Sequence, residues 1–361
     1  MKVAIIGGGI VGSTAAYYLS KESGLEVTLF DEGKGQATKA AAGIISPWLS
    51  KRRHKAWYRL ARQGAEFYQK LVADLRQDDV LTDFYQQNGV YVLKKDEQRL
   101  QELYELALNR RQDAPLMGEV SLLSEEDVAQ TFPGLVGFHQ LVAVSGGARV
   151  DGALLLERLH QASQITTFSK KVSLTVTQQG YEVDGQLFDQ VILATGAWLG
   201  QLLEPLGYSV DVRPQKGQLR DYQTTAHTDD YPVVMPEGEW DLIPFTKGKI
   251  SLGATHENDQ AWDLTIDQSK LDQLEKEALA QYPLLSEAKV TNERVGTRAY
   301  TSDFAPFFGS LPHHKGIYVA SGLGASGLTT GPLIGYTLAQ LVAEKLTTLT
   351  VADYPVERYV T

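Results

Sequence analysis

The chain has 361 residues, 43% of them hydrophobic and 22% charged, with a formal net charge of −10. This is a globular composition, and the length allows two domains of ordinary size or one elaborate domain. The acidic balance argues against a nucleic-acid partner, because affinity for phosphate backbones comes mainly from lysine and arginine. We interpret the basic cluster from Lys51 to Lys55 as a solvated loop or a first helical turn.

The chain contains no cysteine, so disulfides, thiolate metal sites and a cofactor bond through cysteine are impossible. Its seven histidines are scattered without the spaced partners of a metal site, and we predict no metal. The apolar N-terminal stretch holds three consecutive glycines and is broken by Lys21 and Glu22. It is too short to span a bilayer, so we expect no stable membrane insertion and a cytoplasmic protein.

The first 31 residues predict a strand, a glycine turn, a helix and a second strand. Val3 to Ile6 is an apolar run, and small or apolar residues then recur at helical spacing after the glycines. In the motif Gly-x-Gly-x-x-Gly, Gly7 allows a tight turn, Gly9 lets the backbone approach phosphates, and Gly12 lets the helix pack closely. The helix N-terminus would present free N–H groups and a positive dipole end to a pyrophosphate.

Asp31 ends the second predicted strand, 19 residues after Gly12. A carboxylate there can accept hydrogen bonds from ribose hydroxyls, which favours FAD or NAD over NADP. The alternative, a glycine-rich hairpin turn, explains neither the helical spacing nor the acid.

Further elements follow in chain order. The patterns predict a loop over residues 33–50, helices over 55–76, 95–112, 122–132 and 150–162, and strands over 89–93, 172–176, 181–183 and 188–194. Residues 212–300 alternate short strands with turns, broken by an acidic helix at about 268–281. The patterns also predict a last strand at 316–320, a glycine-rich turn at 322–327 and a helix near 330–346. This order of elements is the same as at the N-terminus, so we expect an anionic group at this second helix N-terminus as well.

Several segments in this order resemble the D-amino-acid oxidase-like flavoproteins, which include glycine oxidase, sarcosine oxidase and D-amino-acid dehydrogenases. Besides the N-terminal motif, the resemblance rests on the segments Thr38–Pro47, Asp189–Trp198, Arg213–Gln218, Ile250–Glu257, Gly296–Gly309 and the glycine-rich run from Gly322, with Asp151 opening a helix. It covers nearly the whole chain.

The resemblance implies an α/β fold with a discontinuous Rossmann-like FAD-binding domain and a second domain built on an antiparallel sheet. We expect the FAD-binding domain over residues 1–76, 140–212 and 296–361, and the substrate domain over 77–139 and 213–295. It also implies non-covalent FAD, held by Gly7, Gly9, Ile10, Val11, Gly12, Asp31, Glu32, Thr38, Ala42, Gly43, Ile44, Val172, Thr195, Gly196, Trp198, Gly324, Ala325, Ser326, Gly327, Leu328 and Thr329.

Arg298 is the residue that the resemblance assigns to the substrate carboxylate. Its guanidinium offers a planar bidentate fork and stays charged when desolvated, which suits that role. The alternative is a structural arginine paired with a buried acid such as Asp303. The family usually has a proline directly after this arginine, whereas this chain has Ala299. The family pattern therefore does not define the backbone conformation at this point.

Two further positions depart from the family pattern. Asp241 stands where amine oxidases of this family often carry a tyrosine that helps hold the carboxylate. An acid there would repel a second carboxylate, attract a cationic amine, or lie on the surface. Ser251 stands where sarcosine oxidases carry a lysine that activates oxygen, which weakens an oxidase interpretation of the sarcosine type. Trp48, Trp240 and Tyr300 could wall a pocket or pack in the core.

The implied reaction is oxidation of a C–N bond in a small amino acid or secondary amine, by hydride transfer to flavin N5, giving an imine that hydrolyses. Oxygen or another electron acceptor would be the second partner, and a homo-oligomer is possible. Three alternatives stay open: a dehydrogenase that uses a non-oxygen acceptor, a non-catalytic FAD-binding subunit, and an NAD dehydrogenase, which would leave the last glycine loop without a ligand.

Overall fold

The computed structural model describes residues 1–50, 54–259 and 262–361. Lys51, Arg52 and Arg53 of the basic cluster therefore lie outside the described residues. His54 caps helix α2 (Lys55–Gln77), because its ring Nδ1 accepts a hydrogen bond from the backbone N–H of Trp57 at 3.1 Å.

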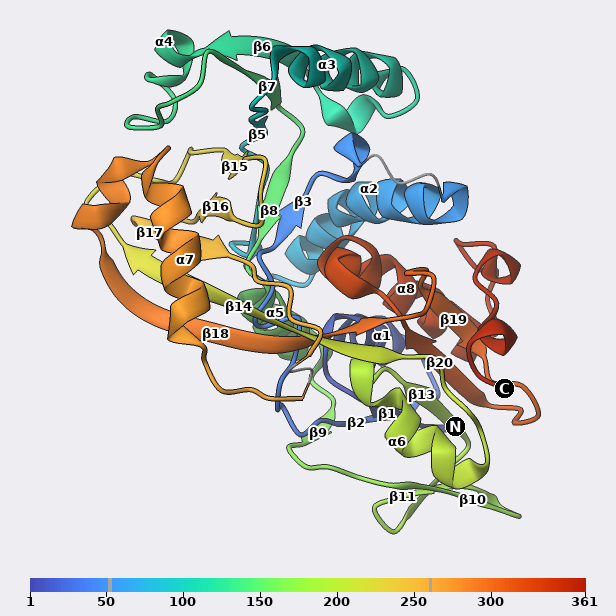
Figure 1. Cartoon of the computed structure of the whole chain (residues 1–361). Helices are drawn as coiled ribbons and strands as arrows, with labels where there is room; N and C mark the ends of the chain where they lie inside the picture. Colours follow the sequence, from blue (N-terminus) through green and yellow to red (C-terminus); the bar gives the residue numbers. More distant parts are fainter. Residues whose placement is uncertain (51–53, 260–261) are drawn as a thin grey trace.

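A six-stranded sheet brings together the start, the middle and the end of the chain (Figure 1). Its strands, in spatial order, are β19 (Phe307–Ser310), β20 (Ile317–Ser321), β13 (Gln190–Leu193), β1 (Lys2–Ile6), β2 (Glu26–Phe30) and β9 (Thr166–Phe168). All neighbours are parallel except the β19–β20 hairpin. The central strands β1 and β13 are buried on both faces and are nearly continuous apolar runs, as expected for a parallel sheet, whereas the edge strand β9 is largely exposed.

Helices cover this sheet and supply most of its core. α1 (Ile10–Ser20) packs against α8 (Gly327–Val342) and α5 (Gly152–Ser163), and α8 also contacts α2. α1 and α8 are buried almost all round, which explains why both sequences are apolar without a clear polar face. Within the described chain, no helix is long and apolar enough to cross a membrane.

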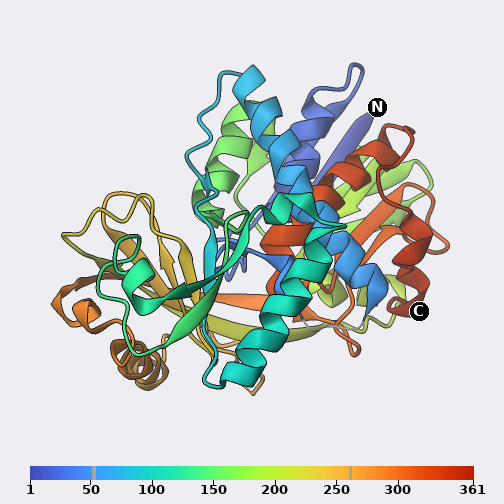
Figure 2. The same cartoon turned by 90° about the horizontal axis from the view of Figure 1, so that it is seen from above.

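A second sheet of eight strands lies beside the first and is mainly antiparallel (Figure 2). Its order is β18 (Lys289–Tyr300), β14 (Arg213–Gln223), β17 (Lys249–Gly253), β16 (Asp241–Pro244), β15 (Val233–Met235), β5 (Val90–Val92), β7 (Gln140–Val144) and β6 (Val120–Ser124). Only the β15–β5 pair is parallel. The long strands β14 and β18 reach from this sheet towards the six-stranded one (Figure 1).

Smaller elements complete the fold. One three-stranded sheet contains β10 (Leu174–Thr177), β11 (Gly180–Val183) and β12 (Gln186–Phe188), and another contains β3 (Ile44–Ile45), β8 (Ala148–Val150) and β4 (Tyr85–Gln86). The remaining helices are α3 (Glu97–Arg111), α4 (Glu125–Val128), α6 (Leu199–Leu203) and α7 (Gln268–Leu279).

The predicted α/β class is confirmed, but the helix predicted over 122–132 is wrong in its first part. Val120–Ser124 is strand β6, which pairs with β7. Ser124 then forms a capping box with Asp127, so only the short helix α4 follows. The capping residues were present in the sequence, but the strand before them depends on a partner that lies elsewhere in the chain.

Candidate functional site

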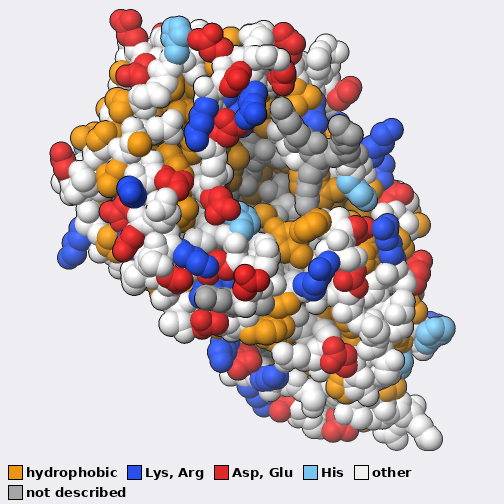
Figure 3. All heavy atoms as spheres, in the orientation of Figure 1, with side chains coloured by type: hydrophobic (Ala, Val, Ile, Leu, Met, Phe, Trp, Pro, Cys, Tyr) orange, Lys and Arg blue, Asp and Glu red, His pale blue; other side chains and the backbone are white. Residues whose placement is uncertain are grey.

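A cavity of about 950 Å³ opens where the two large sheets meet. Its lining comes from the turn after β1, residues 31–50, the segments after β9 and β13, the ends of β16 to β18, and the loop before α8. Figure 3 shows a hollow near the middle of this face, with acidic side chains and a histidine beside it. The volume is typical of a cofactor site.

The turn between β1 and α1 has the geometry of an anion site. Gly7 has φ +103°, and a Cβ there would lie 2.4 Å from the carbonyl oxygen of Ala194. The first N–H of α1, on Ile10, donates to Thr38 Oγ1 at 3.0 Å. The other N–H groups of the first turn have no acceptor within the helix, so they are available to an anion in the cavity.

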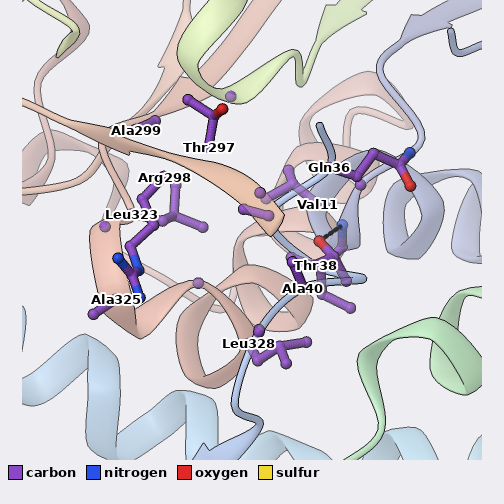
Figure 4. A pocket seen from close by; sticks show the side chains of 18 of the residues that line it. Val11, Gln36, Thr38, Ala40, Thr297, Arg298, Ala299, Leu323, Ala325 and Leu328 are labelled. Atoms are coloured by element: carbon purple, nitrogen blue, oxygen red, sulfur yellow. Dashed lines mark hydrogen bonds between the residues drawn. The ribbon is translucent and has the colours of Figure 1, made fainter. Parts of the chain in front are cut away.

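Asp31 lies at the end of β2 and also lines the cavity. Gln36 Nε2 donates to Asp31 Oδ2, which fixes the carboxylate at the cavity wall. Figure 4 shows Gln36, Thr38 and Ala40 on one side of the pocket and Arg298, Leu323 and Ala325 on the other.

Three buried polar atoms in the cavity wall have no hydrogen-bond partner among the described residues. They are Gln36 Oε1, Ser46 Oγ and Thr195 Oγ1. Burying such groups without a partner costs free energy, so they indicate a polar ligand that supplies the missing bonds. A dinucleotide carries ribose hydroxyls and phosphate oxygens that fit this set.

The loop before α8 closes the opposite wall. The hydroxyl of Tyr300 accepts a hydrogen bond from the backbone N–H of Ala325 at 3.0 Å. Gly324 packs against the Tyr300 ring so closely that a Cβ would lie 2.2 Å from it. The N-terminus of α8 therefore faces the same cavity as the N-terminus of α1, with its positive dipole end inward.

The residues predicted to hold FAD line this cavity with one exception. Those that do are Gly7, Gly9, Ile10, Val11, Asp31, Glu32, Thr38, Ala42, Gly43, Ile44, Val172, Thr195, Gly196, Trp198, Gly324, Ala325, Ser326, Gly327, Leu328 and Thr329. Gly12 is not in the lining. A Cβ on it would lie 1.9 Å from the carbonyl oxygen of Gly7, so its place is in the packing of α1 against the turn.

Arg298 projects from β18 into the cavity, on the side of the strand opposite to Thr297 (Figure 4). Its NH1 donates to the carbonyl oxygen of Thr255 at 2.9 Å and to Gln215 Oε1 at 3.2 Å. NH2 and Nε make no hydrogen bond with the described residues. A Cβ on Gly217 would lie 2.6 Å from NH1, so the guanidinium occupies the space that this glycine leaves open. Burial lowers the pKa of Arg298, but the group stays cationic.

The alternative pairing of Arg298 with Asp303 does not occur. Asp303 instead forms an ion pair with Arg358 at 2.7 Å and accepts a hydrogen bond from the hydroxyl of Tyr359. No acid of the described chain lies within 4.0 Å of the Arg298 nitrogens. The guanidinium at the cavity wall therefore has no ion-pair partner among the described residues, although the more distant charge of Glu257 acts to raise the pKa of Arg298.

Asp241 lies at the start of β16 and lines the cavity, so the surface interpretation of this residue is wrong. Its carboxylate has no hydrogen bond or ion pair with the described residues. Burial raises the pKa of Asp241 to about 7. An acid in this state takes up or releases a proton near neutral pH.

His256 and Glu239 also line the cavity and were missed by the sequence prediction. The pKa of His256 is lowered, first by burial and then by the positive charge of Arg298. The histidine is therefore neutral near pH 7. The signal for it was its place within the segment Ile250–Glu257, one of those that carry the resemblance.

Three other positions singled out from the sequence stay out of the cavity lining. Ser251 is fully buried, donates to Asp221 Oδ1 at 2.5 Å and accepts from Arg294 NH2 at 3.0 Å. Trp48 and Trp240 belong to the core, whereas Tyr300 lines the cavity. In the described residues no group of three histidine or acidic side chains is arranged to hold a metal ion.

Comparison with known proteins identifies the family. A profile of the FAD dependent oxidoreductase family matches residues 2–341. The chain is 40% identical to the uncharacterized oxidoreductase YurR of Bacillus subtilis, with 97% of each chain covered. It is 30% identical to the glycine oxidase of Pseudomonas aeruginosa, with 98% of each covered. The crystal structure of iminodiacetate oxidase from Chelativorans sp. BNC1 superposes with a TM-score of 0.92 at 33% identity, covering 99% of this chain and 98% of that one.

The chain therefore belongs to the FAD-dependent oxidoreductases, and its cofactor is FAD. The turn at the N-terminus of α1, the Asp31 carboxylate at the cavity wall and the polar atoms without a described partner are compatible with this dinucleotide.

We expect Thr195→Val to weaken FAD binding without destabilising the apoprotein. The variant removes a buried hydroxyl that has no protein partner, so the apoprotein should unfold at the same or a higher urea concentration. The hydrogen bond to FAD would be lost, which should raise Kd about 5- to 13-fold, since one such bond is worth about 1–1.5 kcal/mol. Fluorescence titration of apoprotein with FAD measures this. Thr195→Ser is the control, and equal Kd values for both variants would contradict the role.

Asp241 should make the stability of the apoprotein depend on pH. Its pKa is about 7 in the folded protein and about 4 in the unfolded chain. Between these values the folded state holds a proton that the unfolded state has lost, so stability falls as pH rises from about 4 to about 7 and then levels off. Asp241→Asn removes this contribution.

Urea unfolding of both apoproteins across this pH range measures the effect. The stability of the Asp241→Asn variant relative to the wild type should increase with pH. Glu239→Gln, which removes an exposed carboxylate from the same cavity, is the matched control. A difference between wild type and Asp241→Asn that stays constant with pH would be evidence against a raised pKa.

Proposed function

We propose that this chain oxidises the C–N bond of a small amino acid or secondary amine, with Arg298 holding the substrate carboxylate. The observation that carries the proposal is a guanidinium in the cavity wall whose NH2 and Nε have no hydrogen-bond or ion-pair partner among the described residues. These two donors match the two oxygens of a carboxylate. Leaving a buried cation without a counter-charge is costly, which favours an anionic ligand at this point.

The proposed FAD contacts are the cavity-lining residues named above, from both glycine-containing loops. The N-terminus of α1 would hold the pyrophosphate, and Asp31, oriented by Gln36, would accept hydrogen bonds from a ribose. The backbone at Ala42 and Gly43 and the N-terminus of α8 would face the flavin ring. Bound FAD supplies the hydride acceptor for the oxidation.

The chain's own residues would then contribute orientation and charge. Arg298 fixes one end of the substrate, and its own position is set by Gln215, Thr255 and Gly217. Fixing the substrate carboxylate would also fix the distance between the substrate α-carbon and the bound flavin, which would lower the entropic part of the activation barrier. The amine must be neutral when the hydride leaves, so a substrate that binds as an ammonium ion would first release one proton to water or to a neighbouring carboxylate. The imine formed would hydrolyse after the oxidation.

The direct test is anaerobic mixing of the yellow holoprotein with small amino acids and secondary amines. Loss of flavin absorbance with at least one of them is the expected result. Absence of bleaching with every compound would exclude this activity and favour the non-catalytic FAD-binding alternative. Oxygen uptake with the bleaching substrate then separates an oxidase from a dehydrogenase that uses another acceptor.

Arg298→Met should raise KM for a carboxylate substrate strongly. Losing a desolvated charge pair costs about 2–5 kcal/mol, or about 30- to several-thousand-fold in affinity. Arg298→Lys keeps the charge but loses the fork, so it should fall between wild type and Arg298→Met. The rate of flavin reduction against substrate concentration measures this, with bound FAD per chain as the control for folding.

Gly217→Ala tests the same contact without touching the charge. A methyl group there would lie 2.6–2.7 Å from three guanidinium atoms, so Arg298 must move. KM should rise while the FAD content stays at the wild-type value. Gly238→Ala is the control in the same cavity, because the nearest atom to its added Cβ is 3.8 Å away. An unchanged KM in Gly217→Ala would remove Arg298 from the substrate site.

A further inference from the structure

We propose that Asp241 makes this site selective for substrates with one carboxylate and a cationic amine, and that it discriminates against dicarboxylates. The inference rests on the proposed function and names the charge pattern of its substrate. Iminodiacetate, after which the structurally similar oxidase is named, carries two carboxylates and serves as the contrasting compound.

The position of Asp241 is set by the second sheet. It pairs with Gly253 of β17, and the next residue in β16, Leu242, is buried in the core on the other face. The alternation of β16 therefore directs Asp241 away from that core and into the cavity lining. A glycine opposite leaves no side chain to cover or pair with the carboxylate.

The side chains of Asp241 and Arg298 carry opposite charges but do not form an ion pair with each other. No ion pair within 4.0 Å joins them, and neither is paired with another charged side chain of the described residues. Two uncompensated charges in one cavity are costly unless a ligand supplies both counter-charges. A zwitterion does so, with its carboxylate on Arg298 and its ammonium group on Asp241.

The other charged or titratable groups near this pair add no further cation. Glu239, in the loop before β16, is exposed and acidic, and His256, after β17, is neutral near pH 7. Three lysines also line the cavity. Lys170 and Lys171 follow β9, with the Lys170 Nζ over the Phe168 ring and the Lys171 Nζ donating to Gln201, and Lys34 lies in the loop after β2. Around Arg298 and Asp241, the described residues thus place the guanidinium and the carboxylates of Asp241 and Glu239.

A second carboxylate on the substrate would meet the carboxylates of Asp241 and Glu239, because the guanidinium of Arg298 already holds the first one. Like charges brought together in such a site cost several kcal/mol. We therefore expect glycine or N-methylglycine to be favoured over iminodiacetate by about tenfold or more in kcat/KM.

The experiment compares glycine, N-methylglycine and iminodiacetate with the FAD-loaded wild type and the variants Asp241→Asn and Glu239→Gln. Stopped-flow flavin reduction gives kcat/KM, and the shift of the flavin absorbance on mixing gives Kd. Asp241→Asn should move the preference towards iminodiacetate by about tenfold or more, while Glu239→Gln, at the exposed rim, should move it less. FAD content and circular dichroism verify folding.

The pH profile supplies a second readout. Ionised Asp241 binds the ammonium group, so the affinity for N-methylglycine should rise as pH increases through about 7 in the wild type. The Asp241→Asn profile should be flat in this range. A slope retained in Asp241→Asn would assign the titration to another group and overturn the inference.

The outcomes separate the two proposals. If no amine reduces the flavin, the proposed function fails, yet the Kd ratio of N-methylglycine to iminodiacetate still tests the charge pattern. A wild type that binds iminodiacetate more tightly, or an Asp241→Asn variant with the wild-type ratio, overturns the inference and leaves amine oxidation standing.

Discussion

The contact between β18 and the loop after β2 holds the two halves of the cavity together. The N–H of Thr297 donates to the carbonyl oxygen of Gly35 at 3.0 Å. A Cβ on Gly296 would lie 2.8 Å from the Cβ of Ala40, so the strand and the loop touch at backbone distance. The dinucleotide wall and the substrate wall are therefore positioned by the same short stretch of β18, immediately before Arg298.

A buried charge network reinforces this contact from the second sheet. Arg294 NH2 binds Asp221 Oδ1 at 3.0 Å, and its NH1 donates to the carbonyl oxygens of Lys39 and Ala41 at 3.0 and 3.3 Å. Ser251 donates to the same Asp221 oxygen. Because every member of this network except Arg294 Nε has a partner, it favours one arrangement of the loop that precedes Ala42 and Gly43.

The sequence predicted what is local, and it missed what depends on the register between distant strands. Both glycine turns were predictable, because a strand, glycines and a helix follow each other within a few residues. His256 was not, because its approach to Arg298 requires β14 to lie between β17 and β18. Strand β6 was missed for the same reason: its partner β7 begins 16 residues later, at Gln140, while its sequence also resembles a helix start.

The treatment of charge differs sharply between the cavity and the rest of the second sheet. Arg220, a few residues beyond Gly217 on β14, binds the carboxylates of Glu275, Glu293 and Asp272 at 2.5–2.9 Å. Buried Glu257, next to His256, accepts from Gln218, Thr255 and Lys270. The fold thus supplies partners for its buried charges where it can.

Arg298 and Asp241 lie on strands of the same sheet and yet have no ion-pair partner among residues 1–50, 54–259 and 262–361. Stability alone would favour replacing either one with a neutral residue, because an unpaired charge at a cavity wall lowers the free energy of unfolding. A charged residue that lowers stability at such a position is better explained by ligand binding than by packing. The two side chains carry charges of opposite sign. A single ligand that bears both charges can therefore pair with both side chains, which an anion or a cation alone cannot do.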